Sequence, residues 1–233
     1  MHLCFAACLV RLLPVGIRTM IFYDYYANVP NEAIDEFMKT QPMGRLITTS
    51  KDGGPHIGLY PFLYLGSTIE LHLHRDDEQL IDLIANPKCV FQCDDIHTTV
   101  PSHWIHPTNA AFATAYYRFV EYKCHSEIIT SSQELSEQQK RLMQHFQPEG
   151  GYQPITENAS AYQGSLNAIA GLRLTLGDRR VKWKLGQNRN PQARKQVIEH
   201  LRERNAQNDR EAADAMQWAL DLERKPSDSG SNT

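Results

Sequence analysis

The sequence offers little that would place the chain in a membrane or in an oxidising compartment. Its apolar run over residues 3–10 is only eight residues long, and Arg11 and Arg18 follow it instead of preceding it. Such a run is too short for a transmembrane helix and has the wrong charge order for a signal peptide. The five cysteines are odd in number and irregularly spaced, so we expect no disulfide framework. These absences predict a cytoplasmic protein.

Several motifs that carry chemistry are also missing. The net charge of -3 gives no global footprint for nucleic acid. There is no Gly-x-Ser-x-Gly nucleophile motif and no Gly-rich dinucleotide loop. Neither Cys-x-x-Cys nor His-Glu-x-x-His occurs, although the pairs His72/His74 and His103/His106 keep a metal or haem site open as an alternative. We therefore assign no catalytic residue and no metal ligand.

What the chain does contain is a succession of short strand-like segments. Segments 46–50 and 56–65 flank a turn at Asp52-Gly53-Gly54, which is a hairpin signal, and segment 68–74 alternates apolar and polar residues. Further strands are expected over 88–93, over 112–129 as one or two strands, over 169–176, and over 181–185 after a turn at 177–178. This order favours a small closed antiparallel sheet with helices in its gaps over a doubly wound parallel sheet.

Helical segments lie between and after these strands. The first starts near Pro30 with Asn31 as its expected cap and with Ile34, Phe37 and Met38 on one stripe. Asp76 or Asp77 is expected to cap the next one, which ends at Asn86-Pro87. Further helices are expected over 131–146, 161–168, 191–204 and 209–224.

The domain organisation follows from this reading. We expect one domain over residues 20–206, with residues 1–19 as an upstream extension outside the fold and Met20 as a natural domain start. A C-terminal helix over 207–224 and a disordered, serine-rich tail over 225–233 should complete the chain. Because an open sheet edge is often covered by a second copy, a homodimer is the default expectation.

The segment 181–189 carries the densest group of directed hydrogen-bond donors. Gln187, Asn188 and Arg189 follow a strand end and precede a basic helix. Such donors suit a phosphate or the polar edge of a ring. The alternative is that Gln187 and Asn188 tie down a loop and cap the helix.

The sequence KWKLGQNR at 182–189 resembles the K-x-K-L-S-Q-N-R signature of the PaiB family, the FMN-binding split-barrel transcriptional regulators. Shorter matches occur in the family's order, over residues 20–206: PMGRLITT with Asp52-Gly53, Tyr60-Pro61-Phe62 for I-P-F, His72 and Arg75 for H-x-x-R, Phe91-Gln92 for F-Q, and Pro101–Trp104 for P-S-W. The chain departs from the family at Leu59, where histidine is usual, at Thr114–Tyr117, at the inserted His103, and at Gln79, where many FMN split barrels have lysine.

The resemblance implies a fold class and a cofactor. The fold would be mainly β with added helices (α+β): an FMN-binding split β-barrel of the pyridoxamine-phosphate-oxidase-like type with C-terminal helices. FMN would be the cofactor, a second copy the partner in a homodimer, and DNA a partner by resemblance only. The basic segment 179–204 could touch DNA phosphates, or it could be a solvated helix face.

The same resemblance, read with the residue chemistry, gives a candidate cofactor site. Arg75 lies just before a helix N-terminus and is the first candidate for a phosphate contact; Gln79, one turn into the helix, would support it. The alternative is that Arg75 pairs with Asp76 or Asp77. Gln92 suits the ring edge, and Trp104 would cover the ring or sit at a dimer interface. The full candidate set is Tyr60, Pro61, Phe62, His72, Arg75, Gln79, Gln92, Trp104, Lys184, Gln187, Asn188 and Arg189.

Some members of this set keep a second interpretation. Tyr60 and Phe62 share a strand face, and core packing is the favoured reading for Phe62. Lys184, Gln187, Asn188 and Arg189 would reach the flavin from the partner chain or fix the floor of the barrel. At the level of function, a PaiB-like regulator is the prediction. A flavin-dependent oxidoreductase of the pyridoxamine-phosphate-oxidase-like type and a haem-binding split barrel are the alternatives.

Overall fold

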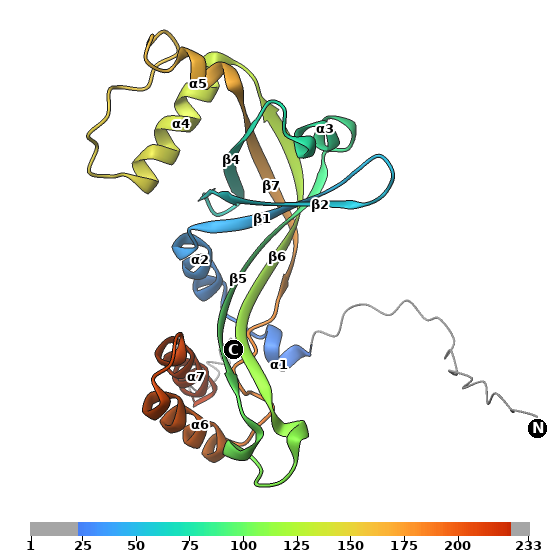
Figure 1. The fold of residues 1–233 in the computed structure, drawn as a ribbon, viewed down its shortest axis with the longest axis vertical. Helices are drawn as coiled ribbons and strands as arrows, with labels where there is room; N and C mark the ends of the chain where they lie inside the picture. Colours follow the sequence, from blue (N-terminus) through green and yellow to red (C-terminus); the bar gives the residue numbers. More distant parts are fainter. Residues whose placement is uncertain (1–22, 225–233) are drawn as a thin grey trace, which may run out of the picture.

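The computed structural model describes residues 23–224 (Figure 1). The predictions for residues 1–19 and 225–233 lie outside these described residues. Among the helices of the described part, we find none with the length and apolar character that a membrane span requires.

The centre of the molecule is one antiparallel sheet whose strands follow the order β2-β1-β5-β6-β7-β4-β3. The strands are β1 Met43–Thr49, β2 Pro55–Pro61, β3 Leu63–Tyr64, β4 Thr68–His74, β5 Lys88–Val100, β6 Thr114–Ile129 and β7 Ile169–Val181. The two edge strands β2 and β3 are consecutive in the chain and only Phe62 lies between them. The sheet must therefore curl until its edges meet, which confirms the predicted α+β split barrel.

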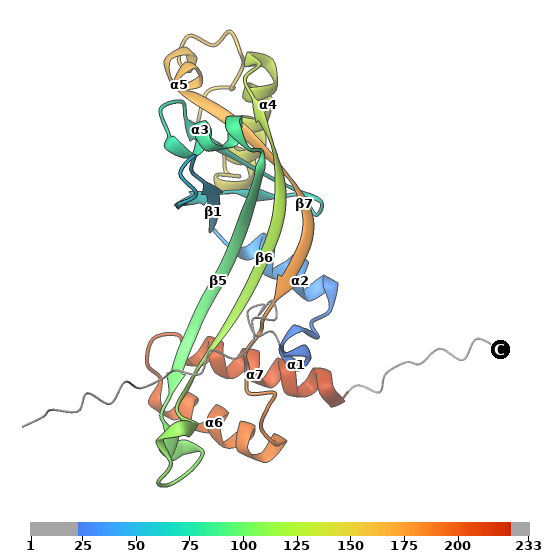
Figure 2. The same cartoon turned by 90° about the vertical axis from the view of Figure 1, so that its right-hand side faces the viewer.

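Helices cover the two ends of this curled sheet (Figures 1 and 2). Near the barrel lie α2 (Asn31–Thr40), α3 (Glu78–Ala85), α4 (Ser132–Phe146) and α5 (Gln163–Ala168). Strands β5 and β6 extend well beyond the barrel as a long pair. At their far end lie α1 (Asp24–Ala27), the short 3-10 helices Ser102–Trp104 and Ala110–Phe112, α6 (Pro191–Arg204) and α7 (Asp209–Arg224). We call the two parts the barrel end and the C-terminal end.

A continuous core runs through both ends. The predicted stripe of α2 (Ile34, Phe37 and Met38) is buried against it, and the same cluster extends to Leu201 of α6 and Met216 of α7. Burying each such side chain contributes on the order of 1.5–3 kcal/mol. The C-terminal helices are thus packed parts of the fold.

Several strand predictions differ from the observed bounds. β5 continues to Val100, beyond the predicted 88–93, and the predicted strand over 181–185 is only the end of β7 followed by one bridge between Lys184 and Tyr117. The sequence predicts one strand over 56–65, but β2 ends at Pro61, whose missing N–H cannot continue the ladder. Phe62 then turns into the core and meets the Phe91 ring edge-on, with the centroids 4.9 Å apart. The sequence also predicts a turn at 177–178, but β7 runs through it to Val181.

A bulge replaces that predicted turn. The register of β6 with β7 shifts between Tyr122 and Cys124, so β7 accommodates one extra residue there. A Cβ on Gly177 would lie 3.1 Å from the carbonyl oxygen of Lys123. Glycine therefore allows the close approach of two strands at this point and does not mark a chain reversal.

The predicted helix ends were right in place but partly wrong in capping. Asn31 is the first residue of α2, and Pro30 occupies the cap position. The side-chain oxygen of Asn31 accepts a hydrogen bond from Arg179 Nη2 at 2.7 Å. Helix α3 is capped by Asp77, one of the two predicted residues. Helix α6 is capped by Asn190, which accepts from the Ala193 N–H at 2.8 Å, and not by Asn188.

Candidate functional site

The predicted site residues fall into two groups on different parts of the fold. The barrel group consists of Tyr60, Pro61, Phe62, His72, Arg75, Gln79 and Gln92. The C-terminal group consists of Trp104, Lys184, Gln187, Asn188 and Arg189. The long β5–β6 pair runs between them (Figure 2).

Gln79 is the centre of the barrel group. Its side chain is 2% exposed and its Nε2 donates to three oxygens: Leu46 O at 2.9 Å, His56 O at 3.1 Å and Thr48 Oγ1 at 3.2 Å. Its Oε1 lies 2.8 Å from the Tyr60 hydroxyl. The amide thus binds α3 to both strands of the β1–β2 hairpin, and these contacts use its hydrogen-bonding capacity inside the protein.

Tyr60 and Phe62 lie on the core side, as their shared face predicts. The Tyr60 hydroxyl lies 3.0 Å from Asp77 Oδ2 as well as close to Gln79, and burial together with Asp77 raises the pKa of this phenol. Phe62 is buried in the core, in line with its favoured interpretation. Pro61 is exposed at the end of β2.

Arg75 is exposed at the start of the α3 region, where the electrostatic environment is acidic. Asp76, Asp77 and Glu78 follow it directly, and Asp77 already accepts the Gln79 N–H at 2.9 Å. Within the described residues, neither Asp76 nor Asp77 forms an ion pair with Arg75. A phosphate dianion here would meet one guanidinium and three carboxylates, so this helix start fits a phosphate poorly.

His72 points to the opposite side of the sheet. It shares a strand face with Glu70, which is buried and accepts two hydrogen bonds from Arg141 of α4 at 2.8 and 2.9 Å. His72 therefore lies on the face that α4 covers. Burial lowers the pKa of its imidazole, which favours the neutral form.

Gln92 lies on the outer face of the sheet, away from the core. Its Nε2 donates to Asp94 Oδ1 at 2.6 Å and its Oε1 accepts from Arg45 Nη1 at 3.1 Å, while Arg45 also pairs with Asp94. This small network covers the amide, since Gln92 is only 8% exposed, and holds it at a fixed position on β5.

Beside Gln92, the outer face is hollowed into a cleft of about 640 Å³ that the sequence did not predict. Three basic side chains lie on it: Lys88, Lys123 and His125. Ile47, Val90 and Leu176 give it apolar walls. Register explains the grouping, because Lys88 faces His125 across β5 and β6 while Ile47, Val90 and Lys123 form the next row. We call this the outer-face cleft.

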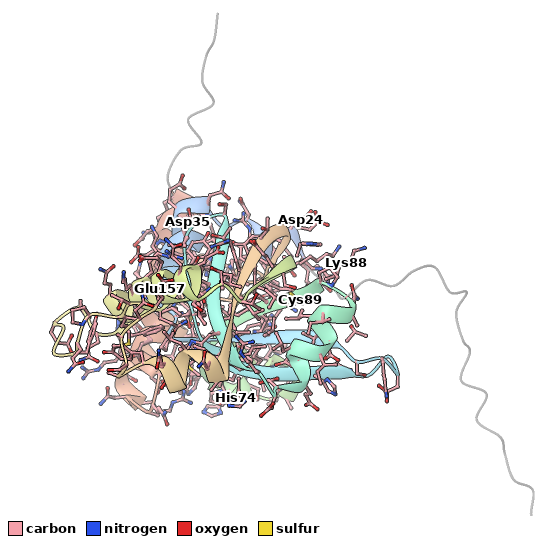
Figure 3. All side chains as sticks on the ribbon, turned by 90° about the horizontal axis from the view of Figure 1, so that it is seen from above. Asp24, Asp35, His74, Lys88, Cys89 and Glu157 are labelled. Carbon is pink, nitrogen blue, oxygen red and sulfur yellow. The ribbon has the colours of Figure 1, made fainter. Side chains whose placement is uncertain are left out.

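The outer-face cleft and the predicted phosphate position are separate places. Figure 3 views the molecule from the barrel end and shows Lys88 and His74, the neighbour of Arg75, well apart. The signal in the sequence was present but incomplete: alternation puts Lys88 and Val90 on one face. Only the pairing register of β5 with β6 brings Lys123 and His125 beside them.

In the C-terminal group, Gln187 folds back on its own loop. It accepts from the Leu185 N–H and donates to the Trp183 carbonyl, both at 2.7 Å, so the loop-tying interpretation holds for it. Lys184 donates to Thr114 Oγ1 at 2.6 Å; burial, then Lys182 and Arg189, lower the pKa of its ammonium. Asn188 is exposed.

The remaining two members pack against aromatic rings. Arg189 places its guanidinium 4.5 Å from the centroid of the Phe112 ring. Trp104 stacks on His200 of α6, with centroids 5.1 Å apart, and lies under the Arg204 guanidinium. Within one chain these contacts fasten the tip of the β5–β6 pair to α6.

A second cluster escaped the sequence analysis at the barrel end. His56 Nδ1 lies 2.7 Å from Asp82 Oδ2, and Thr48 Oγ1 donates to the same oxygen at 2.6 Å. The hydrogen bond to Asp82 raises the pKa of His56. Sequence reasoning had no signal for this pair, because the two residues lie 26 positions apart on a strand and a helix.

The curled sheet, split between β2 and β3 and flanked by helices, has the architecture of a split-barrel protein. It is similar to the FAD and heme binding protein from Mycobacterium smegmatis (16% identity, 72% of this chain and 78% of that chain, TM-score 0.58). It is also similar to the flavocytochrome Anf3 from Azotobacter vinelandii (14%, 70% and 72%, 0.58) and to a conserved hypothetical protein from Mycobacterium tuberculosis (17%, 71% and 91%, 0.52). At these identities the likeness concerns the fold alone.

The family is given by a sequence model. A family described as "Putative FMN-binding domain" matches residues 20–178, which is more than half of the chain. The chain therefore belongs to this FMN-binding-domain family. A comparison with curated proteins gave no significant match.

Proposed function

We propose that this chain is an FMN-binding split-barrel protein that acts as a homodimer and as a regulator of the PaiB type. The observation that carries the FMN part is the family match over residues 20–178. The regulatory part rests on the resemblance of the 182–189 signature and of the shorter motifs that precede it in the chain.

The residues of the outer-face cleft fit FMN. A flavin nucleotide needs cations for a dianionic phosphate, an amide for the ring edge and apolar walls. Lys88 and Lys123 supply cations, of which Lys123 also pairs with Asp178 at 3.1 Å; His125 adds an imidazole, and Ile47 and Val90 supply walls. The volume of about 640 Å³ lies within the range of roughly 300–1,000 Å³ usual for ligand sites.

In this arrangement Gln92 would meet the ring edge, since it lies one row further along the same sheet face. Bound FMN would supply hydride or electron transfer, and the chain would bind it and limit its access to solvent. Arg75 remains the alternative phosphate contact, opposed by the carboxylates beside it. Tyr60 and Gln79 would then shape the hairpin behind the cofactor instead of touching it.

One observation supports a homodimer. Ile57 and Leu59 on the outward side of β2 are 63% and 56% exposed, and neighbouring apolar side chains on one strand face are typical of a contact surface. We propose that docking brings the C-terminal group of one chain toward the barrel of the other. Asn188 is the best placed of that group to contact a partner, because it is exposed.

The DNA-binding part of the proposal faces a specific obstacle. The basic segment 179–204 uses several of its cations internally: Arg179 bonds Asn31, Arg194 pairs with Glu223 and Arg202 pairs with Asp214. A DNA contact through this segment would need the remaining cations. If it exists, affinity for duplex DNA should fall steeply with added salt, and no binding at low salt would reject it.

The decisive experiment is a titration of the purified full chain with FMN, followed by flavin fluorescence. Riboflavin, which lacks the phosphate, is the matched ligand control, and haemin tests the haem alternative. Lys88→Ala with Lys123→Ala should weaken FMN binding more than riboflavin binding if the outer-face cleft holds the phosphate. Arg75→Ala should do so if the α3 start holds it. No quenching by either flavin would overturn the proposal.

A further inference from the structure

A second cleft, of about 500 Å³, lies between the β1–β2 hairpin and α3. It contains none of the predicted site residues. His56 and Asp82 line it, together with Lys51, Asp52, Glu78 and Ile81. We call it the hairpin cleft. It adjoins the outer-face cleft, since Thr49 and Asn86 line both.

The buried carboxylate of Asp82 and the partly exposed imidazole of His56 form one wall of the hairpin cleft. Asp82 is only 7% exposed, and its Oδ2 receives both the Thr48 hydroxyl and the His56 Nδ1 side of the ring. An ionised carboxylate in that position keeps the proton on Nδ1 and fixes the ring plane. The other nitrogen, Nε2, is then directed to Glu78 Oε2, which lies 3.5 Å away.

Thr48 and the backbone of His56 are fixed in turn. Gln79 Nε2 bonds both Thr48 Oγ1 and the His56 carbonyl, so the imidazole is held at its own backbone and through Asp82. The fold of the chain does not require a histidine at the surface to be held by such contacts. Rigid orientation of one ring nitrogen toward a cleft is what a binding or proton-exchanging group requires.

The charges around His56 select the sign of a ligand. The groups that face it are Asp82 and Glu78 from α3 and Asp52 from the hairpin turn, with Lys51 on the rim. Three carboxylates therefore stand against one imidazole and one ammonium. Ile81, on the α3 side of the cleft, is 65% exposed and offers an apolar wall.

We propose that the hairpin cleft binds a small organic amine, whose primary ammonium group donates to His56 Nε2 and pairs with Glu78 while its alkyl chain lies on Ile81. This goes beyond FMN binding and does not depend on it. An ammonium can donate to Nε2 only when that nitrogen carries no proton. Binding of the amine therefore expels the Nε2 proton of a charged His56 to solvent.

The test uses n-butylammonium as the probe, with 1-butanol and butyrate as neutral and anionic probes of the same chain length. The imidazole resonances of His56 in the full chain report both binding and protonation. Butylammonium should shift them and lower the pKa of His56, because the bound cation opposes a second positive charge. Butyrate should cause no shift. Equal shifts with all three probes, or tighter binding of butyrate, would overturn the proposal.

Variants locate the ammonium group. Glu78→Gln keeps an exposed, hydrogen-bonding side chain and should weaken butylammonium binding about two- to fivefold. Glu137→Gln, on the exposed surface of α4, is the matched control and should have no effect. Asp82→Asn should leave Nε2 poorly oriented and reduce binding further; if that variant does not fold, the Glu78 and Glu137 pair still decides.

The outcome separates from that of the FMN proposal. The butylammonium titration is read in the chain without flavin and again after addition of FMN. A chain that binds the amine but no flavin would overturn the proposed function and keep this inference. A chain that binds FMN but shows no cation preference at His56 would do the reverse.

Discussion

The barrel end and the C-terminal end each contain a glutamine whose side chain bonds backbone groups, Gln79 and Gln187. The two side chains differ in how deeply they are buried. Gln79 is 2% exposed and bonds oxygens of β1, β2 and Tyr60, whereas Gln187 is half-buried and bonds only its own loop. Gln79 joins segments that are distant in sequence, and Gln187 joins residues two and four positions away. The barrel end is therefore held by long-range polar contacts beside its clefts, while the signature loop at the other end largely holds itself.

The strongest test of this comparison removes each glutamine. Gln79→Ala removes four hydrogen bonds of a buried amide, at about 1 kcal/mol each, so we expect a loss of about 4 kcal/mol. Tyr60 and Thr48 keep Asp77 and Asp82 as partners, so the Leu46 and His56 carbonyls are the groups most affected. Gln187→Ala should cost less, about 2 kcal/mol, because it removes only two hydrogen bonds within one loop. Urea denaturation of both variants measures this, and equal losses would contradict the contrast.

The C-terminal end has a deeply buried arginine, and it gives the next largest effect. Arg194 is 1% exposed and pairs with Glu223 through Nη1 at 2.7 Å, while its Nε and Nη2 have no partner within the described residues. Glu223→Ala should cost about 3 kcal/mol, since it leaves the guanidinium unpaired. Arg194→Met should be neutral or stabilising. Thermal unfolding of the two variants tests this. If the ion pair itself were the stabilising element, Arg194→Met would lower the Tm at least as much as Glu223→Ala.

Acid should weaken the C-terminal end first. Arg204 pairs with buried Asp209, with Thr98 also bonded, and lowers the pKa of Asp209 from 3.8 to about 2. Because this pKa is lower in the folded state, the stabilisation is present above pH 3.8 and is lost as the pH falls toward 2. We expect a loss of about 2 kcal/mol across that range. Asp209→Asn should not show it in acid titrations of the unfolding free energy.

The barrel end should respond to pH with the opposite sign. The hydrogen bond to Asp82 raises the pKa of His56 above its ordinary 6.5. The stabilisation is therefore fully present below pH 6.5 and is lost as the pH rises through the folded value. Unfolding measured between pH 6 and 9 should show the decline in the natural chain and not in His56→Gln. A rise in stability over this range would mean that His56 is held neutral.

The sequence predicted most of this architecture where the signal is local. Strand β4 and helices α6 and α7 were predicted at their observed bounds, since alternation, Asn190-Pro191 and the apolar stripe lie within each segment. The bulge at Gly177 was missed because it depends on the register with β6. A glycine–aspartate pair looks the same in a turn and in a bulge.

The site was less predictable, for the same reason. Gln79 was placed near a phosphate because of its position after Arg75, but the rotation of α3 turns it inward. The His56–Asp82 pair and the grouping of Lys88 with Lys123 and His125 arise only when separate elements meet. The chemical type of each residue is given by the sequence, whereas its neighbours across the sheet could not be predicted from it.

The single residue between β2 and β3 has a mechanical consequence. Phe62 joins β2 to β3 at one end of the split between them. The two strands can therefore separate further only at the other end of the split. Widening it by force would drag that ring out from under Phe91. A molecule that entered the split would thus displace Phe62 in the core together with the helices α2, α3 and α4 that contact these two strands.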